Sequence, residues 1–175
     1  MSIVDWFLIQ WLRGGRYRWS RLRRRLCERC YISTALPSVS SLEDIQVYLS
    51  RVKWTMDGPL HLFDSISYPQ TVWAKKKDDC DGFAILAATL LHQWNLDLNP
   101  VLVTAMTRPV SSSHTVCVFA STEGGLWFFD NASLKQEEYK TYKEIVSRIS
   151  EKARTLVCWD VRNPESLNML EFHKE

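Results

Sequence analysis

The sequence has no apolar run long enough to cross a membrane. Its most apolar stretch, Ile3 to Leu12, is interrupted by Asp5 and Gln10 and falls short of the roughly 20 residues that a helical span needs. This stretch also precedes the arginines, whereas a secretory signal places its charges first and a small-residue cleavage site afterwards. We therefore expect a soluble, cytoplasmic protein.

Cysteines are too few and too irregularly spaced for a disulfide framework. The five, an odd number, are Cys27, Cys30, Cys80, Cys117 and Cys158. This pattern favours a reducing compartment. Cys27-x-x-Cys30 has the spacing of half a zinc site, but neither a second cysteine pair nor a closely spaced histidine pair follows it. We therefore expect no bound metal.

Acidic residues are scarce in the first 30 positions, where eight arginines stand against Asp5 and Glu28 and give a net charge of +6. The whole chain carries +2, so the other residues carry −4 and the basic character is local. After Gly14-Gly15, which we expect to be a flexible break, Trp19, Leu22 and Leu26 recur at helical spacing. This segment predicts a basic amphipathic helix.

The basic segment has three possible roles. It can be a solvated helix face, it can contact nucleic-acid phosphates, or it can lie on an anionic membrane surface. No RNA- or DNA-binding motif supports the second role. An anionic partner would be bound through Arg13, Arg16, Arg18, Arg21, Arg23, Arg24 and Arg25. The sequence does not indicate an oligomeric state.

The rest of the chain reads as one folded domain, because 46% of the residues are hydrophobic and eight are tryptophan. Residues 31–40 look like a linker. Ser40 and Glu43 have capping-box spacing and predict a helix through about Val52. Residues 54–79 look irregular. A long apolar stripe predicts a helix that begins near Cys80, with Asp78 or Asp79 as its cap.

Strand patterns dominate the second half. We expect strands at 100–106, 114–120 and 126–130, with a hairpin loop at 121–125, a helix at 136–150 and a final strand at 155–161. The whole predicts an α+β domain in which a helix packs on an antiparallel sheet.

Cys80 is the candidate nucleophile. It lies on the buried side of the first turn of the predicted helix, where the helix dipole and unpaired backbone N–H groups favour a thiolate. Asp79 and Asp81 oppose this by their charge. We expect them to point away or to pair with Lys75, Lys76 or Lys77.

His114 and Asp130 are the candidate base and its orienting group. If Ala120 pairs with Leu126 across the five-residue loop, Val116 faces Asp130, and side-chain alternation puts His114 on the same face. Diagonal neighbours of this kind have Cβ atoms roughly 7–8 Å apart or less. Asp130 can then fix the tautomer of the imidazole and stabilise its charged form.

Three motifs resemble those of the transglutaminase-like superfamily, which includes bacterial and phage cysteine proteins. Residues 77–84, KDDCDGFA, resemble the G-D-C-(D/E)-x-x-A nucleophile motif, although Asp78 stands where a glycine is usual. Residues 113–116, SHTV, resemble the histidine strand, and residues 128–131, FFDN, the aspartate strand. The order Cys, His, Asp and the separations of 34 and 16 residues also match.

The resemblance implies a papain-like core with Cys80, His114 and Asp130 as a catalytic triad. It divides the chain into a basic, Trp- and Arg-rich helical extension, 1–35, and a catalytic domain, 36–175. It implies acyl transfer from an amide of a protein or peptide through a thioester at Cys80, by a peptidase, amidase or transglutaminase without a cofactor. In some related enzymes an upstream Trp or Gln completes the oxyanion hole, a role that would fall to Trp73 or Gln70 here.

Two other functions stay open. The same fold can be a catalytically silent binding module that docks through its basic arm. Alternatively, the protein can be a small nucleic-acid-associated protein whose basic N-terminus is the functional part.

Overall fold

The computed structural model describes residues 3–27, 34–56, 65–122, 124–153 and 155–175, without the side chains of 3–5, 24 and 27. Its centre is a six-stranded antiparallel sheet in the order β6-β5-β4-β3-β7-β8. The strands are β3 (Val101–Arg108), β4 (His114–Ala120), β5 (Leu126–Asp130), β6 (Ser133–Tyr139), β7 (Thr155–Arg162) and β8 (Met169–Lys174). A short parallel pair joins β1 (Lys53–Trp54) to β2 (Lys77–Asp78).

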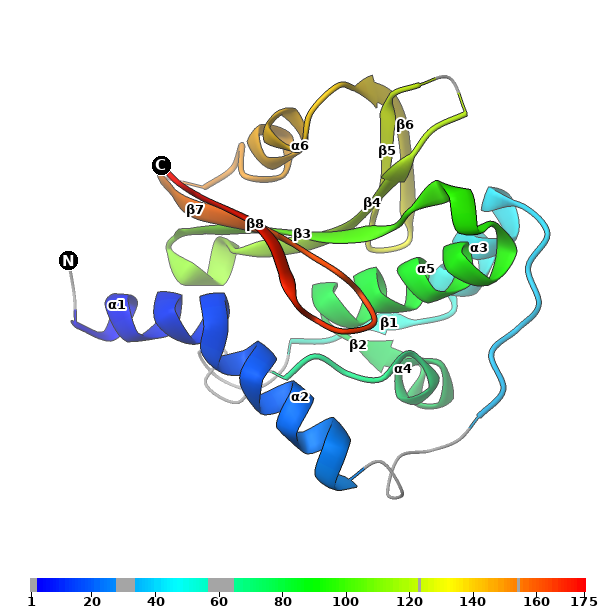
Figure 1. The fold of residues 1–175 in the computed structure, drawn as a ribbon, viewed down its shortest axis with the longest axis horizontal. Coiled ribbons are helices and arrows are strands. Elements are labelled where there is room, and N and C mark those ends of the chain that lie inside the picture. Colours follow the sequence, from blue (N-terminus) through cyan, green and yellow to red (C-terminus); the bar gives the residue numbers. More distant parts are fainter. Residues whose placement is uncertain (1–2, 28–33, 57–64, 123, 154) are drawn as a thin grey trace.

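Helices lie on both faces of the sheet (Figure 1). They are α1 (Ile3–Gln10), the π-helical turn η1 (Trp11–Gly15), α2 (Arg16–Cys27), α3 (Leu42–Ser50), α4 (Pro69–Lys75), α5 (Cys80–Trp94) and α6 (Tyr142–Ile149), with short 3₁₀ turns at Leu96–Leu98 and Val110–Ser112. The predicted α+β architecture is confirmed. No helix in the described ranges is both long and apolar enough to cross a bilayer.

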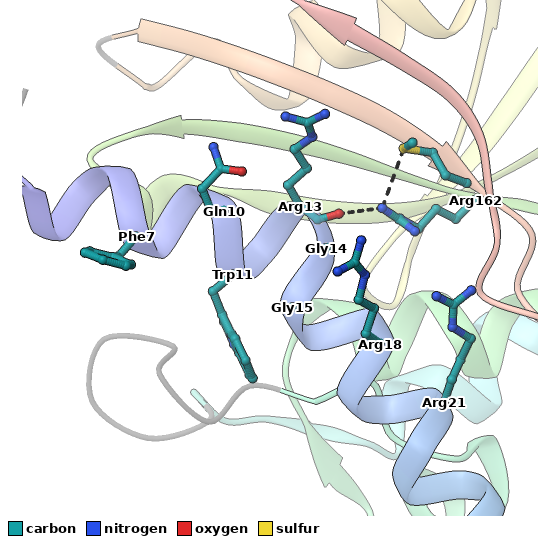
Figure 2. Close-up of a pocket in the computed structure, with 10 residues that line it drawn as sticks. Phe7, Gln10, Trp11, Arg13, Gly14, Gly15, Arg18, Arg21 and Arg162 are labelled. Carbon is teal, nitrogen blue, oxygen red and sulfur yellow. Dashed lines mark hydrogen bonds between the residues drawn. The ribbon is translucent and has the colours of Figure 1, made fainter.

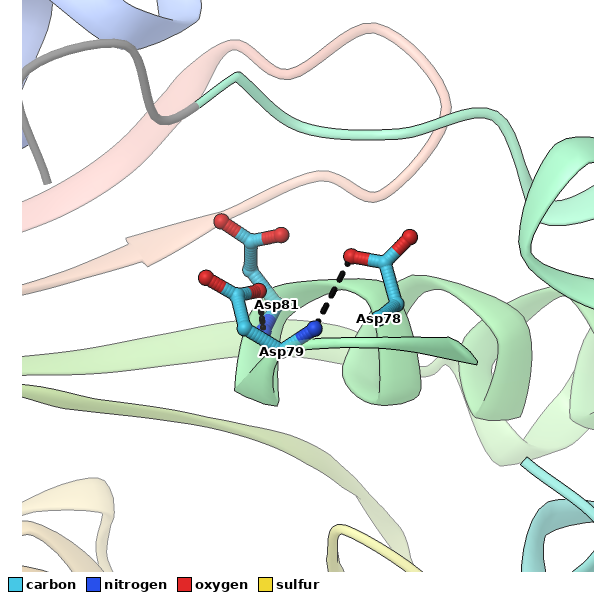
Figure 3. A group of neighbouring side chains, drawn as sticks. All are labelled: Asp78, Asp79 and Asp81. Carbon is cyan, nitrogen blue, oxygen red and sulfur yellow. Dashed lines mark hydrogen bonds between the residues drawn. The ribbon is translucent and has the colours of Figure 1, made fainter. Parts of the chain in front are cut away.

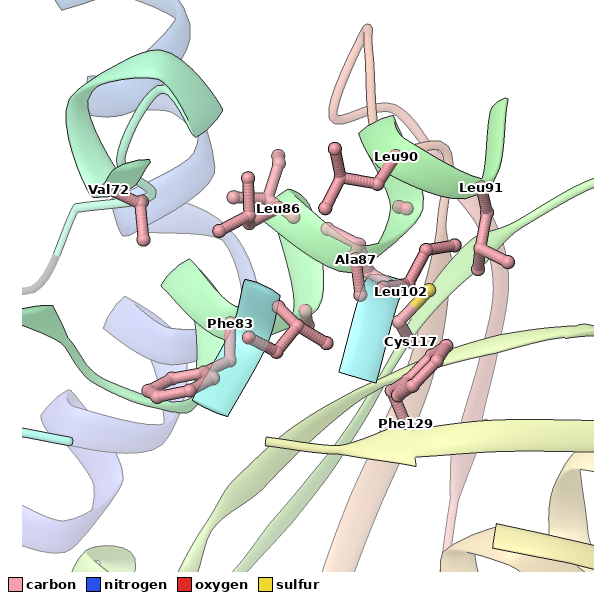
Figure 4. Packing of buried hydrophobic residues seen from close by; sticks show 14 of the residues in the cluster. Val72, Phe83, Leu86, Ala87, Leu90, Leu91, Leu102, Cys117 and Phe129 are labelled. Carbon is pink, nitrogen blue, oxygen red and sulfur yellow. The ribbon is translucent and has the colours of Figure 1, made fainter. Parts of the chain in front are cut away.

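Helix α5 forms the main core with one face of the sheet. Ten of its residues are buried. Ala87 and Leu91 lie close to Leu102, Cys117 and Phe129 of the strands, whereas Leu86 points toward Val72 of α4 (Figure 4). The apolar face of α5 therefore packs on the apolar side chains that alternate along the strands. The predicted start of this helix at Cys80 is confirmed, and Asp79 caps it by accepting from the backbone N–H of Asp81 at 3.1 Å.

Helix α6 covers the opposite face of the sheet. Its Ile145 and Val146 pack with Val116, Val118 and Phe128. Successive residues of β4 therefore point alternately toward α5 and toward α6, which fixes the environment of each side chain near the site.

The second N-terminal helix turns a polar face toward the core. Gly14-Gly15 does not interrupt the helical path, which runs from Ile3 to Cys27, but the pair ends the π-helical turn at which the chain changes direction between α1 and α2 (Figure 1). The apolar stripe of α2 is exposed: 49% for Trp19, 47% for Leu22 and 74% for Leu26. The buried face of α2 is the polar one instead, and carries Arg16, Tyr17 and Ser20. Tyr17 belongs to the main core cluster.

Other local expectations need correction. Residues 136–139, where a helix was expected to begin, belong to the edge strand β6 (Ser133–Tyr139), and α6 is confined to Tyr142–Ile149. Residues 69–75, expected to be irregular, form α4. The cap of α3 is Ser41, which accepts from Asp44 N–H, while Ser40 donates to the Asp44 carboxylate. Short polar segments of this kind lack the apolar periodicity on which sequence prediction depends.

Candidate active site

Cys80 is the first residue of α5 and is half-buried. The two other cysteines with described side chains, Cys117 and Cys158, are buried. Burial raises the pKa of the Cys117 thiol far above its usual value, and burial together with the Asp160 charge raises the pKa of Cys158 to about 11. Among these three thiols, only Cys80 combines partial exposure with a helix N-terminus.

His114 and Asp130 form a direct pair. Cys117 pairs with Phe129 and Ala120 with Leu126, as the sequence predicted, so His114 and Asp130 share one face of the sheet. His114 Nε2 lies 2.7 Å from Asp130 Oδ1. The hydrogen bond from His114, with His114, Lys135 and Arg148 as nearby charges, holds the pKa of Asp130 below its usual value despite partial burial. Because the carboxylate accepts at Nε2, the lone pair of the neutral ring lies on Nδ1.

Cys80 and His114 line one recess at the end of the sheet. Alternation along β4 places His114 on the face that α6 covers, whereas α5 covers the opposite face. His114 is, however, the first residue of β4. From this end position it lines the same small recess, about 10 Å³ in volume, as Cys80. The other lining residues are Leu12, Arg16, Asp79, Thr104, Ser113 and Thr115.

Arg16 was expected at the surface but is buried beside the nucleophile helix. Its side chain is 3% exposed, and its Nη1 donates to Asp81 Oδ2, on a fully buried side chain, at 3.0 Å. Its Nη2 donates to Tyr17 Oη at 2.9 Å. Asp81 therefore pairs with an arginine from α2, a partner that was not among those considered from the sequence. The available signal was the charge imbalance between the basic N-terminus and the acidic remainder.

A buried polar layer extends from this ion pair into the sheet. Tyr17 Oη lies 3.2 Å from Thr104 Oγ1, which lies 3.1 Å from Thr115 Oγ1. A second buried pair, Arg162 to Asp160 at 2.8 Å, places its guanidinium 3.6 Å from the centre of the Tyr17 ring. Burial nevertheless raises the pKa of Asp160 above its usual value. Two arginines thus enclose Tyr17 between α2 and the strands.

Three buried carboxylates, Asp78, Asp79 and Asp81, cluster at the start of α5, with oxygens within 4.8 Å of one another (Figure 3). Such a group resembles a cation site, but each of the three carboxylates already accepts a hydrogen bond from the protein. Asp78 accepts from Asp79 N–H, Asp79 accepts from Asp81 N–H, and Asp81 accepts from Arg16. We interpret the cluster as the cap and anchor of α5.

The remaining sequence candidates lie elsewhere. Trp73 and Gln70 are on α4, and neither lines the recess of Cys80. Trp73 packs edge-on against Tyr48, with Lys76 over its ring. An oxyanion role for them thus stays an expectation without geometric support.

Of the other histidines, His92 and His173 do not line the recess of Cys80. His92 lies 3.4 Å from Glu165, and His173 stacks on Trp159 at the surface. His61 and Cys30, and the side chain of Cys27, lie outside the described residues.

Comparison with known proteins supports the class that the motifs indicated. A family profile described as a transglutaminase-like domain matches residues 28–157. The chain therefore belongs to this transglutaminase-like family. A search of curated proteins finds no match. Helices α1 and α2, with Arg16 and Tyr17, precede the matched region, and the buried Arg162 follows it.

Proposed function

We propose that the protein is a cysteine-dependent acyl-transfer enzyme that forms a thioester at Cys80. The observation that supports this most is the pairing of His114 with Asp130 at 2.7 Å on the rim of the recess that Cys80 lines. A thiol at a helix N-terminus, a base beside it and a carboxylate behind the base are the elements of nucleophilic catalysis by cysteine. Membership of the transglutaminase-like family adds to this argument.

In the proposed reaction, His114 Nδ1 accepts the Cys80 proton and the thiolate attacks an amide carbonyl carbon. The C–S bond forms, the C–N bond breaks, and the imidazolium gives its proton to the departing amine. Water, or an amine in a transglutaminase, then attacks the thioester carbonyl carbon while His114 accepts its proton. The new C–O or C–N bond forms, the C–S bond breaks, and His114 returns the proton to the departing Cys80 sulfur. Asp130 keeps the proton of the neutral ring on Nε2 and stabilises the imidazolium.

Substitution of the three residues tests this proposal. Cys80→Ala should abolish turnover of a glutamine- or peptide-amide substrate without changing the fold, and His114→Ala should be almost as damaging. Asp130→Asn should reduce turnover less than either. Double variants should lose little more than the worse single variant, because the residues act as one unit. The matched control is Cys158→Ala, which removes a buried thiol away from the recess.

Activity would be measured by release of ammonia or peptide and by incorporation of a labelled amine, which separates hydrolysis from transamidation. A Cys80→Ala protein as active as the wild type would overturn the proposal. A wild-type protein that is inert toward both assays and toward an acyl-type thiol probe would favour the alternative, a silent transglutaminase-like binding module.

A further inference from the structure

We infer that Arg16 is a positioning residue of the proposed active site, which balances the Asp81 charge beside Cys80 and thereby favours the thiolate. This inference rests on the proposed function of Cys80. Its basis is the buried 3.0 Å ion pair between Arg16 and Asp81, in which both side chains are at most 3% exposed. Arg16 also lines the recess itself.

The charges around Cys80 come from four elements. Asp81 follows Cys80 on α5, and the cap residue Asp79 precedes it. Asp78 lies at the end of β2. His114 of β4 and Arg16 of α2 line the recess with Cys80. Without Arg16, three carboxylates would face one imidazole. Such an excess of negative charge would disfavour the thiolate form of Cys80.

Arg16 lies outside the region that matches the family profile. The profile begins at residue 28, so the transglutaminase-like region by itself lacks the guanidinium that pairs with Asp81. Helix α2 supplies the missing charge. Its Tyr17 fixes the guanidinium by accepting from Nη2 at 2.9 Å.

The test measures the alkylation rate of Cys80 against pH, which needs no substrate. In Asp81→Asn the asparagine keeps the size of the aspartate and its acceptor oxygen, while Arg16 stays charged because a guanidinium does not lose its proton in this range. The pH of half-maximal alkylation should therefore fall by about one unit, a roughly tenfold faster reaction below the midpoint. Arg16→Met should raise this pH, and Arg16→Met with Asp81→Asn should return it close to the wild-type value.

Asp160→Asn is the matched control. It removes an equally buried, arginine-paired carboxylate on β7, whereas Asp81 directly follows Cys80 on α5, and should move the midpoint less than Asp81→Asn. If Arg16→Met fails to fold, the pH profiles of Cys80 alkylation in Asp81→Asn and Asp160→Asn still test the inference. A rapidly reacting Cys80 whose midpoint is the same in wild type and Asp81→Asn would overturn this inference alone. A wild-type Cys80 that labels as slowly as Cys117 would instead overturn the proposed function.

A different observation, the exposed face of α2, supports a second inference: we propose that this face binds an anionic lipid surface. Trp19, Leu22 and Leu26 form an exposed stripe at i, i+3, i+7 spacing. Arg18, Arg21 and Arg25 form a parallel stripe shifted by one residue, so the two stripes lie about 100° apart around the helix. On α1, Trp6 and Phe7 are also exposed, at 44% and 61%.

The basic stripe borders two cavities beside β7 and β8, of about 690 and 660 Å³. Figure 2 shows Arg13, Arg18 and Arg21 extending to the side of the helices that faces these strands. Glu165 is the only carboxylate among the residues that line the two cavities, against Arg13, Arg18, Arg21 and Arg25, while the fifth arginine, Arg162, is already paired with Asp160. The surface is therefore complementary to an anion.

Lipid fits both stripes, whereas nucleic acid fits only the basic one. Exposed leucines contribute little to binding nucleic-acid bases. An exposed Trp–Leu stripe beside arginines is instead the pattern of helices that lie in a membrane interface. Arginines near an anionic leaflet each contribute about a fivefold gain in binding.

Co-sedimentation with phosphatidylglycerol-containing and pure phosphatidylcholine vesicles tests the proposal. The wild type should bind the anionic vesicles at least tenfold better. Arg18→Gln with Arg25→Gln, and separately Leu22→Ser with Leu26→Ser, should each reduce this binding by on the order of tenfold. Controls are Lys152→Gln and Leu96→Ser, which change exposed residues outside α2. Equal binding to both vesicles, or binding to a single-stranded oligonucleotide without vesicle binding, would overturn it.

Discussion

The side chain of Asp78 fills the space that a Cβ atom at Gly82 would need. A Cβ built there overlaps the Asp78 carboxyl carbon and oxygen, and both residues are buried. Asp78 occupies the position where proteins with this nucleophile motif usually have glycine. The Asp78 carboxylate fits here because residue 82 has no side chain. The identities of residues 78 and 82 are therefore coupled.

Gly82→Ala should therefore destabilise the protein, although alanine is the better helix former. Overlap in a packed region costs typically about 1–3 kcal/mol, which exceeds the helix-propensity gain of about 1 kcal/mol. Asp78→Gly with Gly82→Ala should recover most of the loss. Chemical denaturation of the single and double variants measures the coupling. Additive losses in the double variant would show that the two side chains do not compete for one space.

Tyr17→Phe should cost about 1–3 kcal/mol, because it leaves the buried Arg16 Nη2 and Thr104 hydroxyl without the phenol oxygen they contact. Tyr139→Phe is the control, since its hydroxyl donates to Glu137 at the surface, and should change stability by less than about 0.5 kcal/mol. Urea unfolding would compare them. Equal small effects would mean that the buried polar layer contributes little to stability.

Cys80 should react with sub-stoichiometric iodoacetamide faster than Cys117 or Cys158 in the native protein. At pH 8 a thiol with a pKa of about 11 has on the order of one thiolate per thousand molecules, and Cys117 has still fewer. Mass-spectrometric mapping would give the order of labelling. Labelling of Cys158 ahead of Cys80 would contradict a nucleophilic role.

The parts of the fold that the sequence predicted are those with strong periodicity. Helix α5 and strands β4 and β5 begin at the expected residues, because long apolar stripes and alternating runs separated by a five-residue loop leave one consistent register. That register also predicted the pairing of His114 with Asp130.

The sequence failed where burial does not follow hydropathy. On α2 the buried face contains Arg16 and Ser20, while the exposed face contains Trp19 and Leu26, so an apolar stripe indicated the wrong side. Arg16 is buried only because Asp81, 65 residues away, neutralises it, and no local pattern reports such a partner. The edge strand β6 was missed because its polar sequence has no apolar alternation.

The pairing of Asp130 should make stability depend on acid pH. Its pKa is lowered in the folded protein, chiefly by the hydrogen bond from His114. A depressed carboxyl pKa stabilises the fold fully above the unfolded value of about 3.9, and this contribution is lost as the pH falls through the folded value. The destabilisation caused by Asp130→Asn should thus be larger at pH 6 than below pH 3. A difference that does not change with pH would show that the charge of Asp130 contributes nothing.

A chain that starts at residue 28 would keep the whole family-matched region, yet it should not fold stably. It would lose Leu8, Ile9, Leu12 and Tyr17, all at most 6% exposed. Burial of each such side chain contributes about 1.5–3 kcal/mol, which together is comparable with the total stability of about 5–15 kcal/mol of a typical domain. It would also leave Asp81 without the guanidinium of Arg16.

Circular dichroism and thermal unfolding would measure this truncation against a full-length control, Trp6→Ser with Phe7→Ser, which removes apolar side chains that are 44% and 61% exposed. The control should unfold within a few degrees of the wild type, because exposed side chains contribute little to stability. The truncated chain should show no cooperative transition. A truncated protein with a wild-type melting temperature and an unchanged pH profile of Cys80 alkylation would mean that α1 and α2 only rest on the domain. In that case the ion pair between Arg16 and Asp81 would have no part in shaping the site.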